Sequence, residues 1–336
     1  MNKITIEQSG QTITTQFHDS TLTEDEYNKI VNGWYSKPDL KLINQEFDSL
    51  MKGKNKISNI TRYYFLNLMS DVKLYQRKWT INEVFKNIDL VRHMMAKIKN
   101  NPKLYKDPTL NDNLSKVFSL GGKGFASRPS NFPLKTVREV LAKYNTNGNY
   151  YDFSCGWGVR LLGSLIHDVN YYGTDPNHLL VDKLNELSKD YKLNKPNSLF
   201  KIDKTVDIRC QGSEIFVPEW ENKMGLIFSS PPYYALEDYK HGNQSYKNDT
   251  TYNEWLSGYF LDTVNNIKKY LTDDGYFLIN INDYSKYSLL NDTKEIIINA
   301  GFELVGYHKL NNVLRINSER NHNDNSELIM VFKKEK

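Results

Sequence analysis

The chain has 336 residues, of which 39% are hydrophobic and 25% are charged, and its formal net charge is +4. No stretch approaches the roughly 18 apolar residues of a membrane span, and residues 1–20 lack the apolar core of a secretory signal. The two cysteines, Cys155 and Cys210, exclude a disulfide scaffold, and no Cys/His cluster has the spacing of a zinc site. We therefore expect a soluble cytoplasmic protein with one large α/β domain, a smaller second domain, no metal and no membrane partner.

Positive charge is concentrated in one segment. Residues 51–110 contain 13 Lys or Arg against 4 Asp or Glu, an excess of nine positive charges, so the rest of the chain is slightly acidic. Such a segment is typical of a protein that binds a phosphate backbone, but a solvated basic face of a helical domain explains it equally well. Aromatic residues within it could stack on bases, although their helical spacing also fits a core: Tyr63, Tyr64, Tyr75, Trp79 and Tyr105.

The first third of the chain predicts a helical domain. Residues 1–17 alternate polar and apolar side chains, which indicates a short hairpin or an ordered tail. From Thr23 to about Lys99, apolar residues such as Val84, Ile88 and Val91 recur at helical spacing. The glycine-rich stretch 120–124 then predicts a flexible joint. We expect residues 1–124 to form a mainly helical, basic domain that binds DNA or recognises the target.

From Phe132 onward the pattern changes to alternating helices and strands. The sequence predicts helices over 134–143, 159–167, 179–191 and 252–271, and strands over 150–153, 171–174, 206–210, 224–229 and 276–282. Strands that alternate with crossover helices form a parallel sheet covered on both faces. Residues 303–308 and 327–332, joined by a polar loop, predict a hairpin that adds an antiparallel edge strand. Residues 125–336 are therefore expected to be one α/β domain.

A short polar and aromatic motif follows the strand predicted over 224–229. It reads Ser230-Pro231-Pro232-Tyr233. Open α/β sheets bind their ligands at the carboxyl ends of the strands, so this motif lies where a ligand is expected. The Ser230 hydroxyl and a backbone carbonyl could hold an exocyclic amine, while Tyr233 could stack on a planar base. The alternative is a simple turn, since Pro-Pro ends a strand and prevents a helix from starting.

A second glycine-containing bend follows the strand predicted over 150–153. It runs from Asp152 to Gly158 and leads directly into a helix, whose free N–H groups could meet a polar ligand. The next strand ends at Asp175, 17 residues beyond Gly158, near the spacing at which an acid binds ribose hydroxyls. These features predict an adenosine-type cofactor. A tight turn with Asp175 as the cap of the next helix is the alternative.

These motifs resemble those of a known family. Asp152-Phe-Ser-Cys155-Gly156-Trp-Gly158 is similar to the cofactor loop of S-adenosylmethionine-dependent DNA amino-methyltransferases of the N4-cytosine and N6-adenine type. The segment 128–133 resembles their methionine-side motif, and 230–233 resembles their catalytic motif, with further similarity from Leu236 to Asp283. The resemblance covers about residues 125–335. It implies a Rossmann-like, mostly parallel, seven-stranded methyltransferase sheet with an antiparallel C-terminal hairpin.

Two departures from the family pattern affect what can be carried over. In many members with the Ser-Pro-Pro-Tyr form, the catalytic motif precedes the cofactor loop, whereas the order is reversed in this chain. Trp157 also replaces a small residue, and Val159-Arg160 replaces a common Thr-Thr. The permutation shifts the target-recognition region, for which the basic helical segment before residue 110 and the loop 234–251 are the candidates.

The resemblance implies a site for S-adenosylmethionine and a flipped base. Ser230 and the Pro231 carbonyl would accept hydrogen bonds from the exocyclic amine, and Pro232 and Tyr233 complete the catalytic motif. Asp175 would bind the ribose hydroxyls, and the segment after the strand 206–210 would lie near the adenine. The implied cofactor-binding residues are Arg128, Asn131, Phe132, Pro133, Asp152, Ser154, Cys155, Gly156, Gly158, Asp175, Pro176, Gln211, Gly212 and Ser213.

The implied substrate is double-stranded DNA. Serine at position 230 resembles the N4-cytosine subgroup, so cytosine is favoured over adenine. No Pro-Cys dipeptide is present, which argues against carbon-5 methylation through a covalent intermediate. An RNA or tRNA base amino-methyltransferase and an inactive, cofactor-binding subunit remain alternatives. The richness in Asn, Lys, Ile and Tyr suggests an A·T-rich genome of a bacterium or phage, and the resemblance implies a nucleoid-associated protein. The sequence leaves open the recognition site, the oligomeric state and a nuclease partner in a restriction-modification system.

Overall fold

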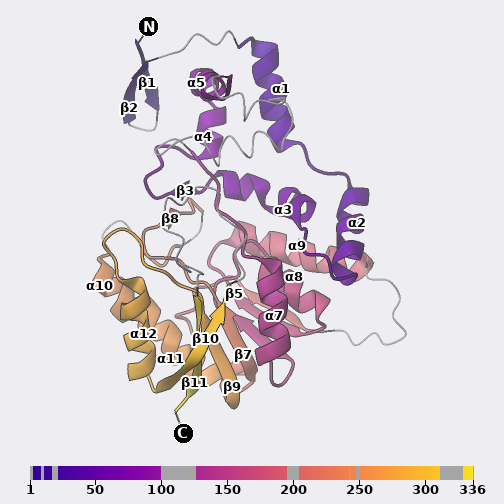
Figure 1. Ribbon diagram of the computed structural model, residues 1–336, viewed down its shortest axis with the longest axis vertical. Helices are drawn as coiled ribbons and strands as arrows, with labels where there is room; N and C mark the ends of the chain where they lie inside the picture. Colours follow the sequence, from indigo (N-terminus) through magenta and orange to yellow (C-terminus); the bar gives the residue numbers. More distant parts are fainter. Residues whose placement is uncertain are drawn as a thin grey trace. The chain divides into compact units, whose positions relative to one another are not determined.

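The computed structural model describes residues 3–8, 11–16, 22–99, 126–194, 204–241, 243–246, 250–310 and 328–335 (Figure 1). The chain divides into two compact units. The first comprises Met1–Pro38, Leu66–Ser130 and Asp238–Lys240, and the second comprises Asp39–Phe65, Asn131–Glu237 and His241–Lys336. The expected boundary between residues 124 and 125, and the joint over 120–124, lie outside the described residues and stay predictions.

The first unit is mainly helical. It contains α1 (Glu24–Tyr35), α4 (Ile81–Phe85) and α5 (Ile88–Lys99), together with the short strand β3 (Lys73–Leu74). Capping boxes fix the starts of two helices, Thr23 with Glu26 for α1 and Thr80 with Glu83 for α4. The expected N-terminal hairpin is confirmed, because β1 (Lys3–Gln8) pairs antiparallel with β2 (Gln11–Gln16).

The second unit is built on a seven-stranded sheet with the order β10-β11-β9-β7-β4-β5-β6. Four neighbouring pairs are parallel, and β11 runs antiparallel to both β9 and β10. The predicted Rossmann-like methyltransferase sheet is thereby confirmed, with β11 inserted between β9 and β10 so that β10 forms the edge. The strands are β4 (Asn149–Asp152), β5 (Asn170–Thr174), β6 (Val206–Arg209), β7 (Met224–Ser229), β9 (Leu271–Ile279), β10 (Phe302–Lys309) and β11 (Leu328–Lys334).

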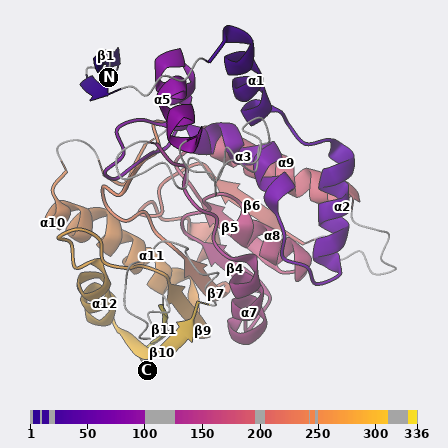
Figure 2. The ribbon, with the colours of Figure 1, turned by 45° about the horizontal axis from the view of Figure 1, so that its top comes forward.

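Helices cover both faces of this sheet. Figures 1 and 2 show α7, α8 and α9 gathered on one face, and α10, α11 and α12 on the other. The remaining helices are α2 (Leu40–Met51) and α3 (Ser58–Ser70), whose residues up to Phe65 group with the sheet. The bounds of the covering helices are α7 (Leu134–Tyr144), α8 (Val159–Ile166), α9 (His178–Asn194), α10 (Tyr252–Trp255), α11 (Leu261–Tyr270) and α12 (Leu289–Asn299).

Burial explains why the central strands form where they do. All six residues of β7 are buried, as expected for a parallel strand that is covered on both faces. The tyrosines of β4 are also buried, and each hydroxyl has a partner: Tyr150 donates to the Phe228 carbonyl (2.8 Å), and Tyr151 lies 2.9 Å from the Thr174 hydroxyl. The carboxyl ends of β4, β5, β6 and β7 therefore lie along one edge of a rigid sheet.

Two predicted elements differ from the observed ones. The strand predicted over 276–282 begins at Leu271, which pairs with Met224 before residues 272–275 bulge out and pairing resumes between Tyr276 and Leu226. The helix predicted over 252–271 contains a π-helical turn at Leu256–Phe260. Among the helices that the structure describes, none is long and apolar enough to cross a membrane.

Candidate active site

A fully buried carboxylate connects the loop after β4 with the end of β7. Asp152 Oδ1 accepts a hydrogen bond from the Ser229 hydroxyl (2.7 Å), and Oδ2 accepts from the Tyr171 hydroxyl (2.9 Å) and from Arg160 Nε (2.9 Å). The side chain of Asp152 is 0% exposed. Because both carboxylate oxygens accept hydrogen bonds from protein groups, Asp152 holds the loop after β4 against β7. Its predicted contact with the cofactor stays a prediction.

The partner of Asp152 was not among the predicted site residues. Arg160, in the first turn of α8, is buried and donates from Nη2 to the Ser154 carbonyl as well as to Asp152. Burial alone lowers the pKa of the Arg160 guanidinium, but the adjacent Asp152 carboxylate outweighs that effect and raises it. The one signal in the sequence was a charged residue within an otherwise apolar helix, Val-Arg-Leu-Leu-Gly-Ser-Leu-Ile.

Two glycines in the loop have left-handed backbone conformations. Gly156 has φ +54° and donates its N–H to Asp175 Oδ2 (3.4 Å), which links the loop after β4 to the one after β5. Gly158 has φ +72° and directly precedes α8. Cys155, between Phe153 and these glycines, is 1% exposed, and burial raises the pKa of its thiol well above the usual value.

Asp175 lies at the carboxyl end of β5, as predicted. Asn177, rather than Asp175, caps α9, since its Oδ1 accepts from the Leu180 N–H (3.3 Å). Burial raises the pKa of Asp175 to about 6, while N–H groups of Asn177 and Gly156 act against this shift. Both carboxylate oxygens accept backbone N–H groups, so Asp175 joins the glycine loop to the start of α9 at the strand end where an acid for the ribose hydroxyls was predicted. Pro176 follows it, and its carbonyl lies 3.9 Å from Cys210 Sγ.

The loop after β6 contains the predicted adenine-side residues. Gln211 bridges the loop through a hydrogen bond from Nε2 to the Ile215 carbonyl (2.9 Å). Ser213 is buried, with its hydroxyl 2.8 Å from Thr263 Oγ1 of α11. At Gly212 an added Cβ would lie 2.2 Å from the Glu214 carboxylate, so the side chain of Glu214 folds against the backbone there.

The predicted methionine-side segment divides between the two units. Arg128 belongs to the first unit, and burial lowers the pKa of its guanidinium. In the second unit, the Phe132 ring packs against Phe228 of β7 (5.6 Å between centroids), and Pro133 directly precedes α7. Asn131 donates from Nδ2 to the Thr61 hydroxyl (2.7 Å), whereas its buried Oδ1 has no partner among the described residues.

The Ser230-Pro-Pro-Tyr motif turns away from the end of β7. Ser229 is the last residue of the strand, and its carbonyl accepts the Asn280 N–H (3.0 Å) at the end of β9. Ser230 and Pro232 are half-buried and Pro231 is buried. The half-buried Tyr233 donates from its hydroxyl to the Asn280 carbonyl (3.4 Å). The corner is therefore fixed against both β9 and the loop after β4.

Asn280 was not among the predicted site residues. Its side chain is 4% exposed, and Oδ1 has no hydrogen-bond partner in the described part of the chain. A buried acceptor without a partner costs stability, so its presence beside Tyr233 is typical of a position that a ligand satisfies. The sequence could not identify it, because many polar residues follow strands without binding anything.

An aromatic cluster supports the corner from the side of α10 and α12. Tyr234 has φ +45°, and its hydroxyl donates to the Thr250 carbonyl (2.6 Å). Its ring packs against Tyr252 (5.5 Å), Trp255 (6.1 Å) and Tyr287 (5.2 Å). The strained backbone at Tyr234 lets consecutive tyrosines face different surroundings, Tyr233 toward β9 and Tyr234 toward this cluster.

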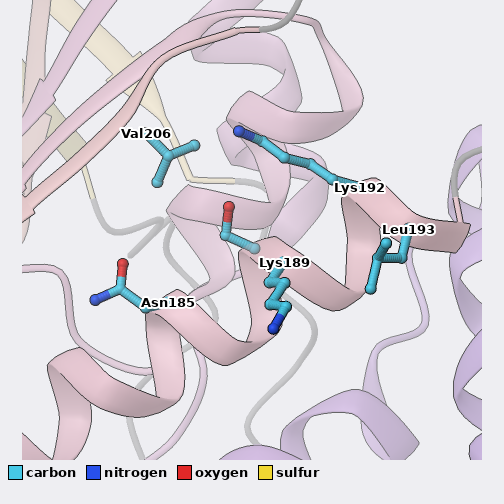
Figure 3. Close-up of a pocket in the computed structure, with 6 residues that line it drawn as sticks. Asn185, Lys189, Lys192, Leu193 and Val206 are labelled. Atoms are coloured by element: carbon cyan, nitrogen blue, oxygen red, sulfur yellow. The ribbon is translucent and has the colours of Figure 1, made fainter.

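A separate pocket lies at the opposite end of the strands. It has a volume of about 270 Å³ and is lined by α9 and the first residue of β6 (Figure 3). Lys192 extends over it and donates to the Lys204 carbonyl (3.1 Å). Because Val206 begins β6, this pocket is at the amino end of the strand and is not part of the candidate site. In the described residues, no group of three or more His, Cys, Asp or Glu side chains could hold a metal ion.

Comparison with known proteins gives only distant similarity. No protein-family model matches the chain, and no curated protein matches it. Among solved structures, a TehB-like SAM-dependent methyltransferase from Corynebacterium glutamicum is 15% identical with a TM-score of 0.38, over 66% of this chain and 94% of its own. A SAM-dependent methyltransferase from Clostridium acetobutylicum is 12% identical with a TM-score of 0.39, over 60% of this chain and 89% of its own. A Burkholderia thailandensis 1,6-didemethyltoxoflavin-N1-methyltransferase, solved with S-adenosylhomocysteine, is 10% identical with a TM-score of 0.37, over 60% and 76%.

Proposed function

We propose that the protein transfers a methyl group from S-adenosylmethionine to the exocyclic amine of a flipped DNA base, with N4 of cytosine favoured over N6 of adenine. The observation that carries the proposal is the position of Ser230-Pro-Pro-Tyr. It follows a fully buried central strand, and the Ser229–Asp152 hydrogen bond (2.7 Å) fixes it beside the glycine loop. An amine acceptor and a cofactor loop are thereby held together on rigid elements.

The residues at the strand ends fit the cofactor. The open backbone at Gly156 allows close approach, because an added Cβ there would have no atom nearer than 3.6 Å. The Asp175 carboxylate would accept the ribose hydroxyls, and the loop at Gln211 would meet the adenine. The unpaired, buried Oδ1 of Asn131 is an acceptor suited to the amino group of the methionine part. When bound, S-adenosylmethionine supplies an electrophilic methyl group on a sulfonium.

The residues of the corner would hold and orient the target amine. The Ser230 hydroxyl and the Pro231 carbonyl would accept hydrogen bonds from its two N–H groups and leave the nitrogen lone pair free to attack. Transfer would form the N–CH3 bond, release the sulfonium sulfur as a thioether, and pass one amine proton to solvent. Tyr233 provides a face for the base, and the unpaired Oδ1 of Asn280 lies beside it. Positioning of this kind can supply most of the rate, since an in-line transfer to a well-held amine needs little covalent help.

The proposed partner is double-stranded DNA. The excess of nine positive charges over residues 51–110 supports binding to a phosphate backbone. Extrusion of the base would cost a few kcal/mol, which contacts with the flipped base and the backbone would offset.

Tritium transfer from labelled S-adenosylmethionine to duplex DNA, followed by mass spectrometry of the nucleosides, tests the proposal. We expect N4-methylcytosine from the wild type. Ser230→Ala should lower kcat by about tenfold or more, since it removes an acceptor from the reacting amine. Ser288→Ala is the matched control, because Ser288 is exposed and its side chain makes no cap hydrogen bond.

Each other outcome overturns a defined part of the proposal. Unchanged transfer by Ser230→Ala would remove the catalytic assignment. N6-methyladenine would replace the cytosine preference, and methylation of RNA but not of DNA would replace the substrate. Binding of the cofactor without transfer to any nucleic acid would identify a non-catalytic subunit.

A further inference from the structure

The helix that crosses the sheet face beside the site contains an irregular turn. Residues Leu256–Phe260 form a π-helical turn between α10 and α11, which amounts to one extra residue in an otherwise continuous helix. Such turns are rare, cost stability and occur frequently at functional sites. In this helix the turn determines the positions of two aromatic residues, Tyr259 and Phe260.

The turn lets two neighbouring aromatic residues pack on the same side chain. Trp255 is 0% exposed and stacks on Phe260 (5.7 Å, 20° between planes), while the Tyr259 ring lies 5.6 Å from Trp255. In a regular α-helix, residues four and five positions after Trp255 would diverge by about 100°. With the extra residue, Phe260 anchors the helix in the core while Tyr259 stays at its border, half-buried.

The Tyr259 hydroxyl lies against the loop after β6. It accepts a hydrogen bond from Ser213 Oγ (3.4 Å), which belongs to that loop. Burial raises the pKa of Tyr259. The predicted adenine-side residues Gln211, Gly212 and Ser213 form the same loop, so the hydroxyl lies beside them.

Hydrogen bonds join the helix to the loop after β6 close to Tyr259. Ser213 Oγ lies 2.8 Å from Thr263 Oγ1, and Asn266 Nδ2 donates to the carbonyls of Ser213 (3.1 Å) and Glu214 (2.9 Å). Asn266 and Thr263 are both buried in α11. The position of Tyr259 is thus set by the same contacts that fix the loop after β6.

We propose that Tyr259 is a cofactor-binding residue, presented by the π-helical turn, whose hydroxyl bonds the nucleoside half of the ligand at the loop after β6. The inference rests on the proposed function, since it takes an adenosine-containing cofactor as the ligand. The hydroxyl would exchange its long bond to Ser213 for a polar group of the ribose or the adenine, and the ring would close the site against Trp255.

Isothermal titration of two ligands tests the assignment. S-adenosylhomocysteine carries both halves of the cofactor, and 5′-methylthioadenosine carries only the nucleoside half. We expect Tyr259→Phe to weaken both by about 3- to 10-fold, the loss of one hydrogen bond. The phenylalanine keeps the ring contact with Trp255, so the thermal unfolding midpoint should stay close to that of the wild type.

Tyr252→Phe is the matched control. Its hydroxyl lies on the same helix but donates to Asp292 Oδ2 of α12 (2.7 Å) and not to the loop after β6, so both affinities should change by less than about twofold. Equal or tighter binding of both ligands by Tyr259→Phe would overturn the assignment and leave the proposed function in place. A loss for S-adenosylhomocysteine alone would overturn the nucleoside contact. If the wild type binds neither ligand, the proposed function itself fails.

Discussion

At the scale of single residues, the Asp152 carboxylate holds together two segments that are 77 residues apart in the chain. Its four bonds come from a hydroxyl of β7, a hydroxyl of β5, a backbone N–H of its own loop and the Arg160 guanidinium. A carboxylate in this environment is stable only while its cation is present, because an unpaired buried charge is very costly.

Removal of that cation should therefore destabilise the protein strongly. We expect Arg160→Leu to lower the free energy of unfolding by roughly 3–5 kcal/mol, measured by denaturant titration. Arg209→Leu is the control, since Arg209 pairs with Asp207 (2.8 Å) with a side chain that is 42% exposed, and should cost less than about 1 kcal/mol. Similar losses in the two variants would contradict the view that the Asp152–Arg160 pair supports the site.

Asp175 should make cofactor binding sensitive to pH. Burial raises its pKa from 3.8 to about 6 in the folded protein. The folded state holds this proton more tightly than the unfolded chain, so the contribution of Asp175 to stability falls as the pH rises through this interval. If the ionised carboxylate accepts the ribose hydroxyls, as proposed, affinity for S-adenosylhomocysteine should drop up to tenfold per unit below about pH 6. Titrations at several pH values should show this dependence in the wild type but not in Asp175→Asn.

At the scale of elements, the junction between the glycine loop and α8 tolerates no side chain. A Cβ on Gly158 would lie 2.9 Å from the Phe65 ring and 3.1 Å from the Cδ2 atoms of Leu184 and Leu187, in addition to the strain of φ +72°. The start of α8 is thus pressed against α3 and α9. This close packing fixes the position of the glycine loop at the start of α8.

Gly158→Ala should therefore cost more than backbone strain alone. We expect a loss of roughly 2–4 kcal/mol in unfolding free energy, together with weaker cofactor binding. Gly53→Ala separates backbone strain from steric crowding, because Gly53 has φ +83° but no atom within 4 Å of an added Cβ. We expect this variant to lose only about 1 kcal/mol of unfolding free energy. Equal losses in the two variants would contradict this expectation, because they would mean that the side chains around Gly158 accommodate the added methyl group at no cost in stability.

The elements predicted correctly from the sequence are those whose burial produces a clear pattern of apolar residues. Met224–Ser229 was predicted with its observed bounds, because a parallel strand that is buried on both faces is a continuous apolar run. Leu271 was predicted as the end of a helix and Tyr276 as the start of a strand, with 272–275 left between them. The structure instead places Leu271 in β9, and residues 272–275 bulge out within that strand. The helix at Leu289–Asn299 was missed entirely, and its core-facing residues are few: Leu289, Thr293 and Ile297.

Side-chain partners were less predictable than elements. The sequence placed Asp175 and Ser230 at strand ends, because strand ends can be read from the pattern. It could not pair Asp152 with Arg160, since a charged residue in a helix does not reveal what it meets. A one-residue insertion such as the turn before Tyr259 is equally hidden, because a period of 3.6 residues remains visible on either side of it.

Across the molecule, the charge distribution predicts how the proposed affinity for DNA would respond to salt. Lys52, Lys54 and Lys56 are exposed and lie in the basic stretch. Their combined replacement by Gln should weaken duplex binding and reduce the slope of log K against log salt by up to about 2.7, or 0.9 for each phosphate contact. Fluorescence anisotropy over a range of salt concentrations would measure it.

A control variant keeps the change in net charge the same. Lys135, Lys143 and Lys309 are exposed on α7 and β10, outside the basic stretch, and their replacement by Gln should leave the slope unchanged. A reduction of similar size in both triple variants would mean that net charge, and not a defined surface, governs binding.

The different burial of the two cysteines makes the natural chain suitable for single-site labelling. Cys155 is 1% exposed with a strongly raised pKa, whereas Cys210 is exposed at the end of β6, next to Gln211. A maleimide fluorophore should therefore attach once per molecule, which mass spectrometry of the intact protein would verify, and modification of both thiols would contradict the buried position of Cys155. The dye would report ligand arrival at the loop after β6 without any introduced mutation.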